Sequence, residues 1–330
     1  MAPDLGHILP LRSRVPTATH AKLMSLAQAQ HALRLTGELL RVSDAMDEAG
    51  IPFLTFKGPT LSLALYGDVG TRRYGDVDLL LPARRVVEAR GVLTGLGYRP
   101  YLDVTDRQLA WATTFLNEYA MVKDGVTVEL HWAVVRPGYR FSLAYEDLAH
   151  YRATMDLAGR QLPVLRNEAL LVVLAVHGSK HGWSRRSWLT DFADLGLREP
   201  SVDWTEVLSI ADQHGATRFV LQAVRLAERE LGAAIPLVLR VGIARDRGAR
   251  VAAVMAARGP REGHDSFLSY IAAMSDTSSR LRALREIFVD PTLLDCQLVD
   301  LPQRLYPLYR VVRPVRLLGK HVLRLGRRGR

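Results

Sequence analysis

Segments with β-strand character cluster in the first half of this chain and become scarce from Asn167 onward. In the first half, short apolar runs bounded by Gly and Pro alternate with segments whose apolar residues recur at helical spacing. In the second half, helical spacing follows in one segment after another. Strand segments that precede a run of helical segments favour the α+β class. We therefore expect an α+β protein in which a small mixed-sheet domain precedes an all-helical domain.

The expected elements lead to a division into four parts. Three regions read as β structure, the third being a hairpin with Asp124-Gly125 at its turn: 51–56, 76–81 and 119–132. The segments that read as helices are 20–49, 59–66, 84–96, 168–180, 188–197, 204–213, 216–231 and 235–254. We expect an N-terminal helical segment over 1–49, a sheet domain over 50–150, a helical domain over 151–300 and a basic tail over 301–330.

Composition excludes several classes of protein. Of 330 residues, 48% are apolar and 24% are charged, which is typical of a chain with a large core and not of a disordered one. The single cysteine, Cys296, excludes an internal disulfide framework and suits a reducing compartment. No apolar run approaches the ~18–20 residues of a membrane span, and the N-terminus lacks the pattern of a secretory signal. We expect a soluble, cytoplasmic protein.

Positive charge is concentrated at the C-terminus. Residues 301–330 contain nine basic side chains and no acidic one, so they carry nine of the ten net positive charges of the chain. Pro314 is expected to break any continuous helix there. Three interpretations remain open: peripheral attachment to the anionic inner face of a membrane, binding of nucleic acid, or docking on the body of the protein. The near-neutral remainder of the chain gives nucleic acid the weaker support.

Three carboxylates indicate a site for cations. Asp76 and Asp78 alternate with apolar residues on a predicted strand, so both point to one face. Glu129 lies within a second apolar strand, where an unpartnered carboxylate is costly to bury. Acidic groups that repel each other stay ionised together when a cation neutralises them, and Mg²⁺ prefers such oxygen ligands. The alternative interpretation is that these residues meet solvent at strand ends.

The segments around these acids resemble a known family. The run FLTFKGPTLSLALYGDVGTRRYGDVDLLLP (53–82) resembles the polymerase-β-like nucleotidyltransferase superfamily, and more closely the bacterial uncharacterised nucleotidyltransferase family. The matching positions are Lys57-Gly58, Leu65-Tyr66, Arg72 and the run 75–80. The segment ELHW (129–132) resembles the third-acid strand of that family, and HGSKHGWSRRSWLTDFADL (177–195) its helical signature. The wider superfamily has Gly-Ser where this chain has Lys57-Gly58.

This resemblance implies a Mg²⁺-dependent enzyme that transfers an NMP unit from an NTP to an acceptor and releases pyrophosphate. Asp76, Asp78 and Glu129 would be the catalytic residues and would hold two metal ions. Four further residues would contact the nucleotide phosphates: Lys57, Gly58, Arg72 and Lys180. The acceptor would be a small molecule, a peptide or a glycan intermediate. Alternatives are an inactive nucleotide-binding or scaffold module, phosphoryl transfer as in a kinase, and an RNA-directed nucleotidyltransferase.

Three histidines accompany these residues. His131 shares the predicted face of Glu129 and would support the metal ligands or lie at the surface. His177 and His181 are four residues apart on a predicted helix, a spacing that also suits a metal pair. No Glu lies between them, so the pattern of a zinc protease is absent. We interpret both as part of a wall facing the substrate, with interdomain packing as the alternative. For Arg72, the alternatives are an ion pair with Asp68 or Asp76 and simple exposure to solvent.

Overall fold

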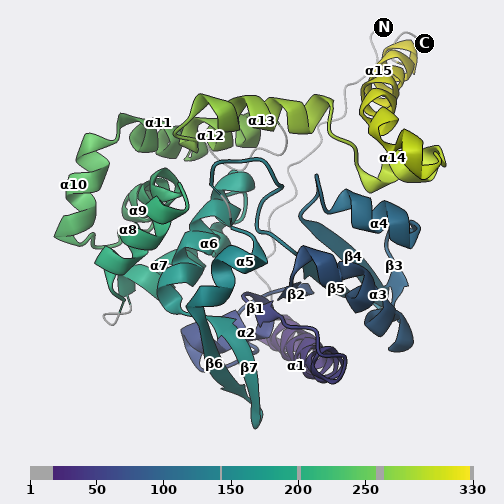
Figure 1. Cartoon of the computed structure of the whole chain (residues 1–330). Coiled ribbons are helices and arrows are strands. Elements are labelled where there is room, and N and C mark those ends of the chain that lie inside the picture. The colour runs from purple at the N-terminus through teal and green to yellow at the C-terminus, as the bar shows by residue number, and fades with distance from the viewer. Residues whose placement is uncertain (1–17, 142, 199–201, 258–263, 328–330) are drawn as a thin grey trace, which may run out of the picture.

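A seven-stranded mixed sheet forms the first part of the molecule, and helices form most of the rest (Figure 1). The computed structural model describes residues 18–327 except 142, 199–201 and 258–263. The strand order is β3-β4-β5-β2-β1-β7-β6. The strands are β1 (Leu54–Thr55), β2 (Asp76–Leu80), β3 (Arg99–Pro100), β4 (Glu118–Lys123), β5 (Val126–His131), β6 (Arg152–Leu157) and β7 (Arg160–Leu165). The expected α+β class with a mixed sheet is confirmed.

The pairing of the strands makes the sheet mixed. Strand β2 runs parallel to β5, and β1 runs parallel to β7, whereas the other neighbouring pairs are antiparallel. The predicted hairpin is β4–β5, and its turn residue Asp124 adopts a positive φ of 49°. Asp tolerates this left-handed conformation better than most side chains, which is why Asp-Gly indicated the turn.

The helices on one side of the sheet place apolar side chains against that face. The long helix α1 (Ala18–Glu48) contacts α2 (Gly58–Tyr66), β2 and α3 (Val86–Gly95), which follows a short 3₁₀ turn (Ala83–Arg85). The core on this side contains Leu39 of α1 together with Val77, Leu79 and Val128 of the central strands. Because side chains alternate along a strand, the acidic residues between these apolar positions point to the opposite face.

The sheet extends beyond residue 150, where we expected its domain to end. The hairpin β6–β7 adds two strands, and Thr55 pairs with Val164 to join it to the rest of the sheet. Arg160 at the start of β7 contacts Asp44 and Asp47 of α1. The segment RATMDLAGRQLPVL is short and contains a proline, so its sequence gave only a weak strand signal.

The second part of the chain packs around the central helix α6 (Asn167–Lys180), most of whose residues are buried. Its neighbours are α7 (Arg186–Ala193), α8 (Trp204–Gln213), α9 (Thr217–Leu231) and α12 (His264–Ala273). Helix α7 continues into a π-helical turn over Asp194–Arg198, and α5 (Tyr145–Leu148) with a 3₁₀ turn (Ala149–Tyr151) precedes β6. Helix α4 (Asp106–Ala112) lies beside the sheet, after β3.

Three sequence expectations need correction. The strand expected over 51–56 is reduced to Leu54–Thr55. The helix expected over 235–254 is two helices, α10 (Leu237–Arg245) and α11 (Arg247–Ala256), because Asp246 leaves the helical conformation and its carboxylate caps α11 by accepting from the Ala249 amide. Pro314 does not break the C-terminal helix α15 (Tyr309–Arg327). Pro314 removes one hydrogen bond to the carbonyl four residues earlier, and the helix continues past it.

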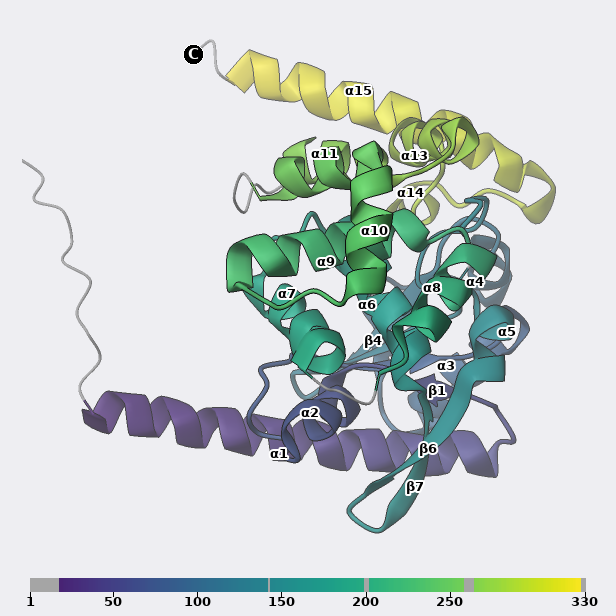
Figure 2. The same cartoon turned by 90° about the vertical axis from the view of Figure 1, so that its left-hand side faces the viewer.

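Helices α13 (Thr277–Phe288) and α14 (Leu293–Leu298) lead to α15 through a 3₁₀ turn (Gln303–Leu308). Helix α15 and helix α1 lie on opposite sides of the molecule in both views (Figures 1 and 2). The expected segment 1–49 is described from residue 18 onward, and Arg328 and Arg330 of the basic tail lie outside the described residues. Within the residues that the structure describes, every helix is too short or too polar to cross a lipid bilayer.

Helix α1 should be an integral part of the fold. Leu39 is 1% exposed in the core beneath the sheet, so Leu39→Ala should lower the free energy of unfolding by about 2–5 kcal/mol in urea titrations. The control Leu33→Ala alters a side chain of α1 that is 64% exposed. It should change the free energy of unfolding by less than about 0.5 kcal/mol. Equal, small effects of both variants would contradict this packing.

Candidate functional site

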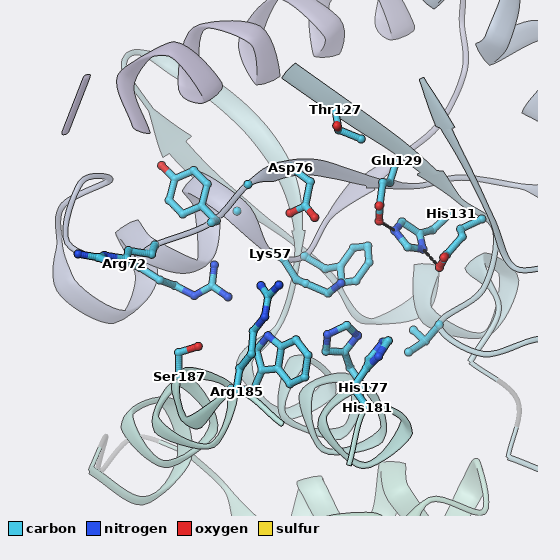
Figure 3. A pocket seen from close by; sticks show the side chains of 18 of the residues that line it. Lys57, Arg72, Asp76, Thr127, Glu129, His131, His177, His181, Arg185 and Ser187 are labelled. Atoms are coloured by element: carbon cyan, nitrogen blue, oxygen red, sulfur yellow. Dashed lines mark hydrogen bonds and ion pairs between the residues drawn. The ribbon is translucent and has the colours of Figure 1, made fainter. Parts of the chain in front are cut away.

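Two adjacent parallel strands place the acidic residues side by side. In the register of β2 and β5, Asp78 is the partner of Glu129, and Asp76 is the partner of Thr127. His131 follows Glu129 by two positions and therefore shares its face (Figure 3). The expectation that Asp76 and Asp78 lie on one face with Glu129 beside them agrees with this register.

Two cationic side chains contact Asp78, the most buried of the three acids. Asp78 Oδ1 accepts from Lys57 Nζ at 3.3 Å and lies 3.0 Å from His131 Nε2. The same ring nitrogen lies 3.1 Å from Glu129 Oε2, so His131 bridges two acids. The Asp78 side chain is 1% exposed, and its second oxygen, Oδ2, is buried without a hydrogen-bond partner. A buried, unpartnered carboxylate oxygen is an available ligand atom.

The proximity of these charges shifts their pKa values in opposite directions. Burial works to raise the pKa of Asp78, but Lys57 and His131 outweigh it, so that pKa lies well below its usual range. Burial disfavours protonation of His131, yet its contacts with Asp78 and Glu129 raise its pKa to about 9. Burial, and then repulsion by Asp78 and Glu129, raise the pKa of Asp76 to about 6. The repulsion among the three acids is therefore compensated less at Asp76 than at Asp78.

Lys57 and Gly58 lie where the chain passes from β1 to α2. The Lys57 ammonium lies 4.9 Å from the centre of the Phe56 ring and also contacts Asp78. Gly58 adopts a φ of +58°, and a Cβ at this position would lie 3.3 Å from the Asp76 carbonyl oxygen. Both the conformation and the close approach to β2 favour glycine here. This turn holds Lys57 against the acidic residues.

The opposite wall comes from α6 and from the start of α7. The rings of His177 and His181 lie 5.1 and 5.3 Å from that of Trp188, and the Arg185 guanidinium lies 5.4 Å from the same indole. Desolvation lowers the pKa of both histidines, and the cations Lys57 and Lys180 lower it further. Both imidazoles are therefore neutral at neutral pH and can each donate and accept one hydrogen bond.

Glu118 is a site residue that the sequence analysis missed. It is the partner of His131 in the antiparallel pair β4–β5, and its Oε2 lies 3.5 Å from His131 Nδ1. Burial works to raise the pKa of Glu118, but Lys180 and His131 outweigh it and hold the pKa well below its usual value. Desolvation lowers the pKa of Lys180, which Glu118 opposes. An acid at the start of the predicted hairpin was the signal available in the sequence.

Arg72 pairs with the helical part of the chain. Its Nε donates to Asp191 of α7 at 2.9 Å, and both side chains are nearly buried, at 9% and 2% exposed. The partner is therefore neither Asp68 nor Asp76, the two considered from sequence. A residue 119 positions away could not be identified as the partner by local spacing. The Arg72 NH1 atom is buried without a hydrogen-bond partner, so the guanidinium keeps an unused donor.

These residues border one cavity of about 440 Å³ between the sheet and the helices (Figure 3). Nine of the ten site residues expected from sequence line it, and Asp78 lies deeper, in contact with Lys57 and His131. Among the described residues, one group of at least three side chains could hold a metal ion, with ligand atoms within 4.8 Å of one another: Asp78, Glu129 and His131. The pair His177 and His181 belongs to no such group within the described residues. The cavity can thus hold a cation at its acidic floor and an anion beside its basic walls.

Relief of the repulsion at Asp76 should stabilise the metal-free protein. Its raised pKa means that the folded protein binds a proton more tightly than the unfolded chain. The stability of the wild type therefore falls as pH rises from about 3.8 to about 6. Asp76→Asn removes this loss and should raise the unfolding free energy at pH 7 by about 1–2 kcal/mol. Urea titrations between pH 4 and 7 in EDTA test this. The control variant Asp212→Asn alters an exposed residue of α8 and should leave the unfolding free energy unchanged. A lower unfolding free energy for Asp76→Asn would contradict the repulsion inferred at Asp76.

Several solved structures resemble this fold weakly. The solution structure of the antibiotic-resistance factor ANT(2″)-Ia is 18% identical, covers 66% of this chain and 93% of its own, and gives a TM-score of 0.33. The crystal structure of ANT(2″)-Ia with adenylyl-2″-tobramycin is 18% identical, with coverages of 63% and 96% and a TM-score of 0.32. An antigenic nucleotidyltransferase-like protein from Paracoccidioides brasiliensis is 14% identical, with coverages of 62% and 93% and a TM-score of 0.33.

No curated protein matches the sequence. The profile of the family described as "uncharacterised nucleotidyltransferase" matches residues 7–232, which is more than half of the chain. That range contains all of the strands, the whole acidic cluster and the helices α6 and α7 that face it. The chain therefore belongs to the uncharacterised nucleotidyltransferase family.

Proposed function

We propose that this protein transfers an NMP unit from an NTP to an acceptor and releases pyrophosphate, with the polymerase-β-like superfamily as its wider group. The observation that carries the proposal is the pairing of Asp78 with Glu129 on parallel strands, with Asp76 on the same face. Asp76 and Glu129 border a cavity that is large enough for a nucleotide and is lined on the other side by basic residues, and Asp78 lies just beneath it. Membership of the nucleotidyltransferase family supports the same reaction.

The residues present fit a magnesium site. Asp78 Oδ2 is buried without a hydrogen-bond partner, and the ligand atoms of Asp78 and Glu129 lie within 4.8 Å of each other. Carboxylate oxygens are the ligands that Mg²⁺ prefers. Asp76, Asp78 and Glu129 would hold two ions, which when bound neutralise the triphosphate and polarise the reacting phosphorus. A bound cation would also relieve the repulsion that raises the pKa of Asp76.

The basic residues of the cavity would bind the triphosphate. Lys57 contacts Asp78 at 3.3 Å, so it can shift from that carboxylate to a phosphate oxygen once a cation neutralises the acid. Lys180 lines the cavity from the helical wall. Arg72 keeps a donor free while Asp191 fixes its guanidinium. Gly58 would let the backbone approach the phosphates closely.

The acceptor would lie on the Glu129 side of the cavity. An acceptor hydroxyl would lose its proton to the Glu129 carboxylate while its oxygen forms a bond to the α-phosphorus. The bond from that phosphorus to the bridging oxygen breaks, and pyrophosphate takes the bonding electrons. His131 contacts Glu129 at 3.1 Å and would hold this carboxylate in place. The neutral rings of His177 and His181, with Trp188, would contact the nucleoside or the acceptor.

Nucleotide binding should depend on both the acids and the metal. In a thermal-shift panel of ATP, GTP, CTP and UTP, one nucleotide should raise the melting temperature by about 2–5 °C with Mg²⁺ and by much less in EDTA. Asp76→Asn should abolish the Mg²⁺-dependent shift, because it removes a metal ligand, whereas the exposed control Asp212→Asn should keep it. The same shift in both variants would contradict the assigned site.

The products distinguish nucleotidyl transfer from the alternatives. With the nucleotide identified above and a candidate acceptor, label at the α-phosphorus should enter the acceptor and free pyrophosphate should accumulate. Glu129→Gln should lower the turnover rate by about 100-fold or more, because it removes the proton acceptor. A nucleoside diphosphate product would instead indicate phosphoryl transfer. Metal-dependent binding with no product from any acceptor would favour a binding module.

A further inference from the structure

The C-terminal helix α15 has two opposite faces, and only one is held by the protein. Tyr309, Arg313 and Arg316 are spaced four and three residues apart and point toward the body. The Tyr309 hydroxyl donates to the Val299 carbonyl at 2.6 Å, and Arg316 Nε donates to Asp295 Oδ1 at 2.5 Å. Arg313 NH2 donates to the Ile287 carbonyl at 3.3 Å. These contacts fix the orientation of the helix about its own axis.

The outward face is aliphatic. Val311, Val315 and Leu318 have the same spacing shifted by two residues, which places them on the opposite side of the helix. They are 58%, 63% and 66% exposed, and Leu308 in the preceding turn is 47% exposed. Twelve of the 22 exposed large apolar side chains of the described residues lie between positions 281 and 318. We call the side chains of Leu308, Val311, Val315 and Leu318 the outer stripe.

The charge beside the outer stripe is positive. Residues 301–330 contain no acidic residue, and Arg304 and Arg310 are exposed. Asp290 and Asp295 are fully buried, Asp295 being paired with Arg316 of α15 itself, and Asp300 is an exposed acid just before this segment. The exposed Arg304 and Arg310 lie outside these ion pairs, so the surface beside the outer stripe is positive on balance. An exposed aliphatic stripe flanked by exposed basic residues, here Arg304 and Arg310, is the pattern of a helix that lies in a membrane interface.

From this arrangement we propose that α15 attaches the protein to an anionic lipid surface, with the outer stripe among the acyl chains and the basic residues at the headgroups. The helix lies along the outer edge of the molecule, away from α1 (Figure 2). A second copy on the stripe would bring two basic helices together without acidic partners. Nucleic acid would favour aromatic side chains for base stacking, and the stripe contains none.

Vesicle flotation of the full chain tests the proposal. The protein should float with vesicles of phosphatidylglycerol and phosphatidylcholine, and much less with phosphatidylcholine alone. Binding should weaken as ionic strength rises from about 0.1 to 0.5 M. The triple variant Val311→Ser, Val315→Ser, Leu318→Ser should bind about tenfold less, because it removes the aliphatic surface. Equal binding to neutral vesicles, or an unaffected triple variant, would overturn the proposal.

Matched variants separate this effect from general loss of apolar surface. Leu237, Val238 and Val241 on α10 are 77%, 43% and 45% exposed, and their triple serine variant should bind vesicles like the wild type. The single variant Val315→Glu adds a negative charge to the stripe and should also prevent binding. Asp76→Asn should leave flotation unchanged. A wrong assignment of the acidic site can therefore be told apart from a wrong assignment of the outer stripe. A dimer or an RNA complex that the Val315→Glu variant disrupts, without vesicle binding by the wild type, would assign the stripe to that partner instead.

Discussion

Repulsion between carboxylates on one face of the sheet is the interaction on which the site depends. Asp76, Asp78 and Glu129 lie on adjacent parallel strands, and the metal-free protein offsets their charge only in part. Lys57 and His131 compensate Asp78, whereas Asp76 keeps a raised pKa. A chain that needed only stability would gain from losing one of these acids. Their joint presence therefore supports the cation site proposed above.

The register that gathers the acids also builds the core. Alternation along β2 and β5 sends Val77, Leu79 and Val128 toward α1, and the intervening acids toward α6. A slip of one residue would bury the carboxylates in the apolar layer and expose the apolar residues to the cavity. Packing of α1 beneath the sheet thus fixes the geometry of the site above it. The fold and the candidate site are consequences of one strand register.

The sequence predicted those features that depend on short-range patterns. The alternation in DVDLLL placed Asp76 and Asp78 on one face, and Asp-Gly located the hairpin that carries Glu129. Pairings between distant segments were not predictable in this way. The partner of Arg72 is Asp191, 119 residues away, and Thr55 pairs with Val164 across 109 positions. The Pro314 error has another origin, since a proline inside a helix removes one hydrogen bond and can bend the helix without ending it.

Arg72 links the two halves of the proposed mechanism. Its carboxylate partner belongs to α7, whereas the residue itself lies in the loop that leads into β2. Tyr66 at the end of α2 makes a second contact of this kind, donating to Asp194 at 2.9 Å. An anion bound at the free donor of Arg72 would therefore be held by a group that already joins the sheet to the helical wall. Because that ion pair is nearly buried, a shift of α7 relative to the loop would require the pair to break or the guanidinium to move with the helix. Binding of phosphate at Arg72, as proposed above, would therefore depend on the position of α7 relative to the sheet.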